Sequence, residues 1–162
     1  MPQNQKDPAQ QFAAVEELLT RWLKERRDVL GRFTELVVAQ DCIVDRNLLD
    51  ERQRTLCELL VDYVSAGHFE VFHELLNEAQ TFGDDATGLV DTVIPAIVDT
   101  TGVILAYEEK YADEDCDWEG IQRDLSSLGE VLESRFVLED QLIAGLHNRH
   151  RDLVSDQAPV GG

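Results

Sequence analysis

The strongest constraint on the fold is the spacing of apolar residues, which recur every three to four positions along most of the chain. Such helical stripes cover residues 12–37, 48–63, 69–79, 89–111 and 118–146. No segment shows the sustained alternation of apolar and polar residues that a half-buried strand requires. The sequence therefore predicts an all-α fold, an up-down helical bundle of four main helices with additional short helices.

Interruptions of the stripes set the expected helix ends. Gly67, which follows Ser-Ala, is suited to the end of the second stripe. Pro95 is expected to kink or split the helix over 89–111, because proline removes a helical hydrogen bond. Asp45 or Asn47 is suited to cap the start of the second helix.

The chain of 162 residues is most simply one domain. We expect a disordered leader over residues 1–11, a helical bundle domain over 12–150 and a disordered tail over 151–162. Both ends are polar, and neither continues the helical stripes.

Cysteine usage and hydropathy indicate a cytoplasmic protein. The three cysteines form no CxxC pair, so neither a disulfide framework nor a structural zinc site is expected. The polar leader lacks the apolar stretch of a signal peptide. No uninterrupted apolar run approaches 18 residues, so we expect no membrane span.

The charge is strongly negative and unevenly placed. The chain carries 33 acidic and 14 basic residues, a formal net charge of −19. Between Thr55 and Gln122, sixteen carboxylates face one cation, Lys110. This excess argues against nucleic acid or an anionic membrane as a direct partner, since both are polyanions. It favours a basic partner such as a helix-turn-helix DNA reader, with a solvated acidic face as the alternative.

The alternative function is a metal-binding helical-bundle protein or enzyme that uses Glu70 and His73. Di-iron bundles use two inward-facing Glu-x-x-His motifs, and Glu70-Val-Phe-His73 is one such motif without a second. His147 and His150 share a helix face near the C-terminus, where we expect them to be solvated surface residues. The sequence predicts no bound metal.

Catalytic motifs are weak in this sequence. Ser65 near His68 could in principle form a nucleophile–base pair, but no Gly-x-Ser-x-Gly turn surrounds it. No phosphate-binding loop or dinucleotide fingerprint is present. We therefore expect no enzymatic activity and no cofactor.

Three blocks of sequence resemble one protein family. They are "RWLKER" at residues 21–26, "LVDYVSAGHFEVF" at 60–72 and "LGEVLESRFVLEDQLI" at 128–143. In order and spacing they are similar to the Rsd/AlgQ family, regulators of sigma D. The likeness runs from about Phe12 to Leu146, and Pro95 falls where members of the family carry a proline.

The resemblance implies an anti-sigma factor with an all-α bundle fold. Such proteins bind the DNA-reading C-terminal domain of the primary sigma factor and affect RNA polymerase indirectly. They favour alternative sigma factors in stationary phase, and in pseudomonads they bear on alginate production.

The second block supplies one set of candidate partner contacts: Asp62, Ser65, His68 and Phe69. Asp62 is the strongest of them, because it interrupts an apolar face where a carboxylate is costly unless paired. Tyr63, Phe69 and Phe72 lie on apolar stripes, which favours the core for all three.

The first and third blocks supply the other candidate contacts: Trp22, Arg26, Arg135, Phe136, Glu139 and Asp140. Arg135 and Glu139 have i,i+4 spacing, which fits a surface helix salt bridge. The alternative is a buried charged network inside the bundle, joined to Asp62 or His68, that fixes side-chain geometry for recognition.

Overall fold

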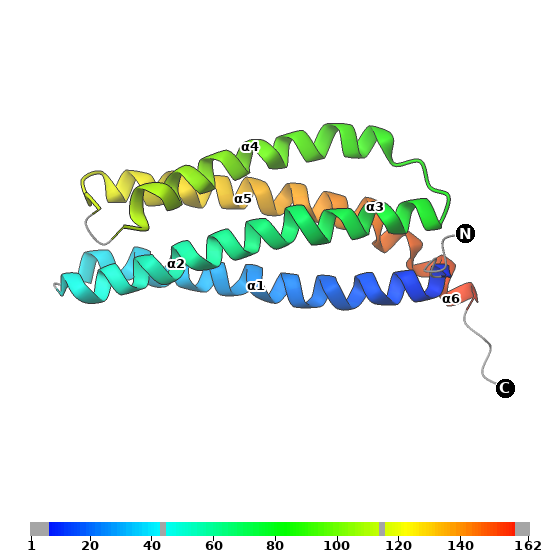
Figure 1. The fold of residues 1–162 in the computed structure, drawn as a ribbon, viewed down its shortest axis with the longest axis horizontal. Helices are drawn as coiled ribbons and strands as arrows, with labels where there is room; N and C mark the ends of the chain where they lie inside the picture. Colours follow the sequence, from blue (N-terminus) through cyan, green and yellow to red (C-terminus); the bar gives the residue numbers. More distant parts are fainter. Residues whose placement is uncertain (1–6, 43–44, 114–115, 158–162) are drawn as a thin grey trace.

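The computed structural model describes residues 7–42, 45–113 and 116–157. It confirms an all-α bundle of four long rods (Figure 1). Within the described residues there is no strand. The elements are α1 (Pro8–Cys42), α2 (Arg46–Ala66), η1 (Gly67–Val71), α3 (Phe72–Thr81), α4 (Thr87–Tyr111), α5 (Ile121–Leu146), η2 (Asn148–His150) and α6 (Arg151–Gln157).

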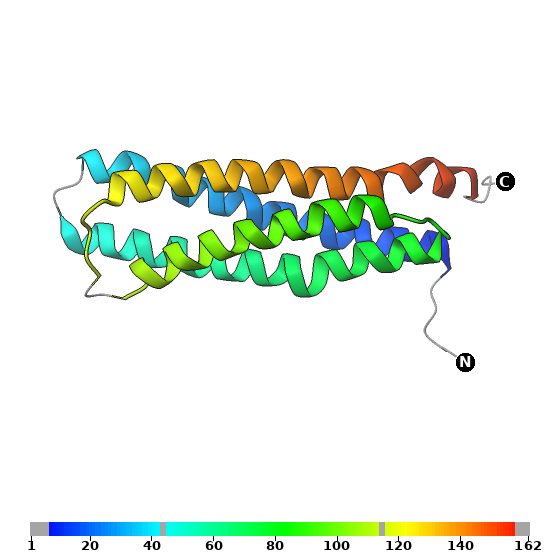
Figure 2. The same cartoon turned by 90° about the horizontal axis from the view of Figure 1, so that it is seen from above.

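The second rod is α2, η1 and α3 joined end to end, as Figure 2 shows from above. It packs against α1 on one side and α4 on the other, and α4 packs closely on α5. The contact between α1 and α5 is the least extensive between neighbouring long helices. The bundle is therefore tightly closed on three sides and more loosely on the α1–α5 side.

Gly67 caps the end of α2, as predicted, but the chain does not leave the helical conformation there. It has right-handed helical angles, φ −58° and ψ −53°, and opens the π-helical turn η1. A Cβ at this position would lie 3.0 Å from Cζ2 of Trp22 in α1. The glycine is therefore explained by the close approach of a large buried ring, and the chain stays helical through it.

Pro95 does not split α4, which runs unbroken from Thr87 to Tyr111. The ring lies on the exposed side of the helix, and Val93 and Ile97 on either side of it are buried. A proline costs the helix a hydrogen bond, and core packing on both sides offsets that loss.

α4 is apolar enough to resemble a membrane-spanning helix, although it contains no long uninterrupted apolar run. By length and composition it could cross a membrane, although Asp91 and Asp99 interrupt its apolar residues. Here α4 packs on α5 and α2, and only 17 % of its most apolar window is buried. Three of its large apolar side chains are exposed, Val98, Val103 and Leu105.

The predicted boundaries of the two ends differ from the structure. α1 begins at Pro8, inside the expected leader, and the Asp7 carboxylate accepts a hydrogen bond from the Gln10 amide at 2.8 Å. An acidic cap followed by proline is a favoured helix start. At the other end, residues 151–157 form α6. The rest of the expected leader and tail, residues 1–6 and 158–162, lies outside the described residues.

Candidate protein-binding site

The candidate contacts of the second block lie at the junction of α2 and η1. Asp62, His68 and Phe69 are exposed there, and Ser65 is half-buried. Asp62 is therefore not an unpaired carboxylate inside an apolar face, because it points to solvent. We call the exposed residues Asp62, His68, Phe69 and Glu70 the η1 corner.

Phe69 is the most exposed large apolar side chain described, at 77 %. Tyr63 and Phe72 are buried, as the apolar stripe predicted, but Phe69 is not. A π-helical turn has more residues than an α-helical turn, so a period of 3.6 does not carry across it. The His68 and Phe69 rings pack edge to face, with centroids 4.9 Å apart.

Carboxylates gather beside this exposed ring. Partial burial raises the pKa of Glu25 in α1, and the nearby negative charges of Asp62 and Glu70 raise it further. The corner therefore joins an apolar anchor to a locally negative potential. Such a surface suits a cationic partner that offers an apolar pocket.

Three other predicted contacts are core residues. Trp22, Arg135 and Glu139 are each at most 2 % exposed. The Trp22 indole stacks on Tyr63, with centroids 5.0 Å apart, and its Nε1 donates a hydrogen bond to the Tyr63 carbonyl at 3.2 Å. These side chains cannot touch a partner without opening the bundle.

Arg135 and Glu139 belong to the buried network that was the second alternative. Nε of Arg135 donates to Oε2 of Glu139 at 2.9 Å. Nη1 of Arg135 donates to the hydroxyls of Thr101 at 2.7 Å and Thr100 at 3.0 Å in α4. The Tyr63 hydroxyl donates to Glu139. The network thus ties α5 to α4 and α2, and it uses Tyr63 in place of the expected Asp62 or His68.

Burial dominates the titration of this network. It raises the pKa of Glu139 to about 7, although Arg135, the Tyr63 hydroxyl and Arg26 act in the opposite direction. Burial also raises the pKa of Tyr63, which keeps its hydroxyl protonated as a donor.

Arg26, Phe136 and Asp140 lie at the outer edge of the network, where α1 meets α5. The Arg26 guanidinium makes two hydrogen bonds to Asp140, at 2.8 and 3.1 Å, and lies 4.5 Å from the centroid of Phe136. Burial disfavours the charged form of Arg26, but the hydrogen bond to Asp140 and the electrostatic interactions with Tyr63, Asp140 and Glu139 together outweigh it and raise the Arg26 pKa. These residues bridge the loosest side of the bundle.

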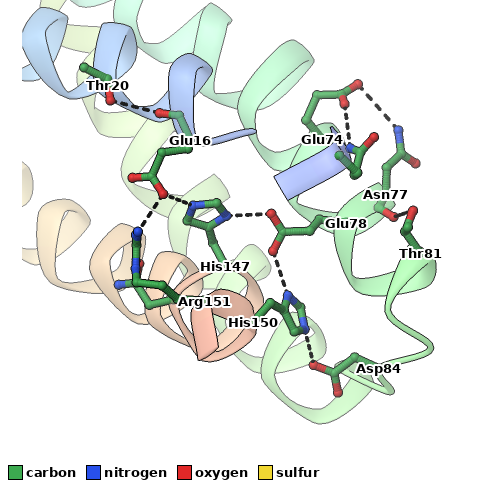
Figure 3. Close-up of polar contacts among 12 residues, drawn as sticks. Glu16, Thr20, Glu74, Asn77, Glu78, Thr81, Asp84, His147, His150 and Arg151 are labelled. Carbon is green, nitrogen blue, oxygen red and sulfur yellow. Dashed lines mark hydrogen bonds and ion pairs between the residues drawn. The ribbon is translucent and has the colours of Figure 1, made fainter. Parts of the chain in front are cut away.

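A buried histidine cluster was missed by sequence reasoning (Figure 3). His147 and His150 are 1 % and 2 % exposed, so their prediction as solvated surface residues is wrong. Their Nδ1 atoms lie 2.5 and 2.7 Å from the two carboxylate oxygens of Glu78 in α3. On their other nitrogens, His147 meets Glu16 at 2.9 Å and His150 meets Asp84 at 3.0 Å.

Aromatic packing completes this cluster. Phe12 stacks on His147 and Phe82 stacks on His150, with centroids 4.1 and 4.3 Å apart. Burial disfavours protonated His147, but hydrogen bonds to Glu78 and Glu16 prevail and raise its pKa. The cluster anchors the C-terminal end of the chain on α1 and α3. The signal that could have found it is Glu78, a carboxylate on the apolar stripe of the third helix.

The residues of the metal-binding alternative do not form a metal site. Glu70 and His73 are both exposed on the outside of the second rod. Within the described ranges, no three His, Cys, Asp or Glu side chains are grouped so that they could hold a metal ion.

Comparison with known proteins gives one family. Residues 1–147 match the family "Regulator of RNA polymerase sigma(70) subunit, Rsd/AlgQ". The relatives include the "Regulator of sigma D" of Yersinia enterocolitica, 30 % identical over 138 residues, which is 83 % of each chain. The protein of the same name from Pectobacterium atrosepticum is 32 % identical over 135 residues, 81 % of this chain and 88 % of the relative. No solved structure matches the chain.

Proposed function

The chain belongs to the Rsd/AlgQ family of regulators of the RNA polymerase sigma(70) subunit, and from this premise we propose that it is an anti-sigma factor. It binds the C-terminal, DNA-reading domain of the primary sigma factor in the cytoplasm and so favours alternative sigma factors. It acts by protein–protein contact and not by catalysis, and it touches no DNA itself.

The observation that carries this proposal is the η1 corner, where Phe69 is 77 % exposed beside Asp62 and Glu70. A domain that reads DNA presents cationic side chains to phosphates. The carboxylates of the corner offer those side chains a competing partner. Phe69 adds the apolar anchor that converts electrostatic attraction into a specific complex.

The alternative, a metal-binding bundle or enzyme based on Glu70 and His73, has less support. Both residues face solvent, whereas the di-iron sites that suggested it use residues facing the bundle interior. Their exposure to solvent fits partner contact better.

Titration calorimetry with the purified sigma C-terminal domain tests the proposal. We expect a 1:1 complex in low salt that Phe69→Ala weakens by about 10- to 100-fold, the loss typical of an anchor residue. Val103→Ala, which truncates another exposed apolar side chain on α4, is the matched control and should bind like wild type. No complex at low ionic strength, or equal binding of an unrelated basic protein, would contradict the proposal.

A further inference from the structure

The loosely closed side of the bundle carries a groove that shares no residue with the η1 corner. It runs between α1 and α5 and has a volume of about 360 Å³. Its apolar lining consists of Leu30, Phe33, Leu132, Phe136 and Val137. None of these residues belongs to the corner, so the groove is a separate surface.

The two walls of the groove expose apolar side chains where solvent would ordinarily select polar ones. Leu30 on α1 is 47 % exposed and Val137 on α5 is 52 % exposed. Both line the same groove with the half-buried Phe33 and Phe136. Apolar side chains grouped in one groove, unlike apolar residues scattered singly over a surface, are a feature of interaction sites.

At one end of the groove, Gly129 determines how closely the Phe33 ring packs on α5. A Cβ on Gly129 of α5 would lie 3.0 Å from Cζ of Phe33, so a side chain at this position would push the ring a few tenths of an ångström away from α5. At the other end, Asp140 holds Arg26 over the Phe136 ring. Both ends of the groove therefore have fixed side-chain positions, and its depth is a property of the folded protein.

The charge at the α5 edge selects among occupants. Glu133 and Asp140 line the groove, and Glu133 is exposed. Asp140 is 59 % exposed and remains paired with Arg26. A second copy of this chain would add its own net charge of −19. Repulsion between like charges disfavours that occupant and nucleic acid alike, so a cationic partner fits best.

We propose that the α1–α5 groove is a second docking site, which takes a basic amphipathic helix of a partner protein. The helix inserts apolar side chains between Leu30 and Val137 and places a lysine or arginine against Glu133. Such a helix would pack along α1 and α5 and close the open side of the bundle, the helix-in-groove mode of recognition. The proposal does not depend on sigma binding at the η1 corner.

A synthetic peptide of about 16 residues, with leucines at helical i, i+3, i+4 and i+7 spacing and lysines elsewhere, is the probe. Its fluorescence anisotropy is followed on titration with the full chain. A control peptide replaces each leucine by serine and keeps the charge. We expect the leucine peptide to bind at least about tenfold more tightly than the serine peptide, because burial of apolar anchors dominates such grooves.

Val137→Asp is the decisive variant. It adds a negative charge, which by electrostatics alone would strengthen binding of a lysine-rich peptide. We expect a loss of about tenfold instead, because the apolar wall is gone. Val103→Asp makes the same change on the exposed face of α4 and should not weaken binding. Phe69→Ala should also leave peptide binding unchanged, which separates this site from the η1 corner.

Equal affinity of the two peptides, or equal affinity of the Val137→Asp and Val103→Asp variants, would overturn the proposal, since attraction would then be general. Sedimentation of the chain without peptide tests whether a second copy of this chain occupies the groove instead. A dimer that Val137→Asp dissolves would assign the groove to a second copy and would overturn the proposal as well. Failure of the wild-type chain to bind the sigma domain, with binding of the leucine peptide intact, would contradict only the function proposed above.

Discussion

The Tyr63 hydroxyl of α2 donates a hydrogen bond to the Glu139 carboxylate of α5, and both side chains are completely buried. Glu139 also accepts from Arg135, four residues earlier on the same helix. Two of the sequence blocks that identify the family therefore meet inside the bundle, where they hold helices together. This relationship separates residues that maintain the fold from residues available to a partner.

Removing the Tyr63 hydroxyl should destabilise the bundle. Tyr63→Phe leaves a buried carboxylate with one donor fewer, at an expected cost of about 1–3 kcal/mol in the free energy of unfolding. Urea denaturation measures this change. Tyr111→Phe is the control, since its hydroxyl bonds to Asp124, whose side chain is 23 % exposed, and water can replace the lost donor. Equal losses in the two variants would show that burial of the network has no special weight.

The stability of the protein should fall as pH rises from about 5 to 8. The pKa of Glu139 is raised from 4.5 to about 7, so between these values the folded state holds a proton that the unfolded state has released. Proton binding by the folded state favours folding below pH 4.5, and this contribution is lost as pH rises through 7. The loss is about 3 kcal/mol.

Denaturation of wild type and Glu139→Gln across this pH range measures the effect. In the variant, the free energy of unfolding should fall less steeply with pH. Some dependence should remain, because the raised pKa of His147 acts in the same direction. If the free energy of unfolding of Glu139→Gln depends on pH as steeply as that of wild type, other groups control the pH dependence.

Glu78 should be critical for docking of the C-terminal end. Its carboxylate contacts both His147 and His150 and is fully buried. Glu78→Gln leaves these histidines with a neutral partner, and we expect the free energy of unfolding to fall by about 2–4 kcal/mol. Glu109→Gln, on the exposed side of α4, should change it by less than about 0.5 kcal/mol. A Glu78→Gln protein as stable as the control would refute this role for the cluster.

Two glycines should respond to alanine with opposite signs. In Gly67→Ala the new Cβ meets Trp22, whose ring is fixed by stacking and by a hydrogen bond. We expect a loss of about 1–3 kcal/mol from overpacking. Gly31 lies in α1 with no atom within 4 Å of its added Cβ. Gly31→Ala should stabilise by about 0.5–1 kcal/mol through helix propensity. Thermal unfolding of both variants tests the pair, and a stabilised Gly67→Ala would show that Trp22 can yield.

Asp62 should affect binding without affecting folding. Because the side chain is exposed, Asp62→Ala should change the melting temperature little. The association rate with the sigma domain should fall, and its dependence on salt should weaken, because one charge of the steering field is removed. Stopped-flow binding at several salt concentrations measures both. Unfolding of the variant would instead assign Asp62 to the structure.

The parts of the fold that depend on local patterns were predictable. The apolar stripes gave the four long rods, and Asp45 caps α2 as expected, with its side chain accepting from the Asn47 amide at 3.0 Å. Gly67 marks the end of α2, but the chain continues directly into η1, and α4 runs through Pro95 without being split. Glycine and proline interrupt helices on average, so a local pattern alone predicts a break at both positions. Val93 and Ile97 on either side of Pro95 are buried, and Gly67 is itself buried against the Trp22 ring, so packing supports a helical chain at both positions.

The candidate site divided according to burial, which the sequence did not reveal. Asp62 and Phe69 proved exposed, whereas Trp22, Arg135 and Glu139 proved buried. All are polar or aromatic residues whose burial depends on the helix opposite them. A π-helical turn, which has no simple sequence signal, moved Phe69 off the apolar stripe.

The sequence by itself determined a helical bundle, a strongly negative charge and a family, because helical period, charge and matching blocks are properties of the chain read in order. Only the tertiary structure decided which charges lie inside. Glu78 meets His147 and His150 from about seventy positions away, and Tyr63 meets Glu139 across a similar separation. A buried charge is tolerable only when a partner is brought to it, and that partner is supplied by packing between helices that no local pattern records.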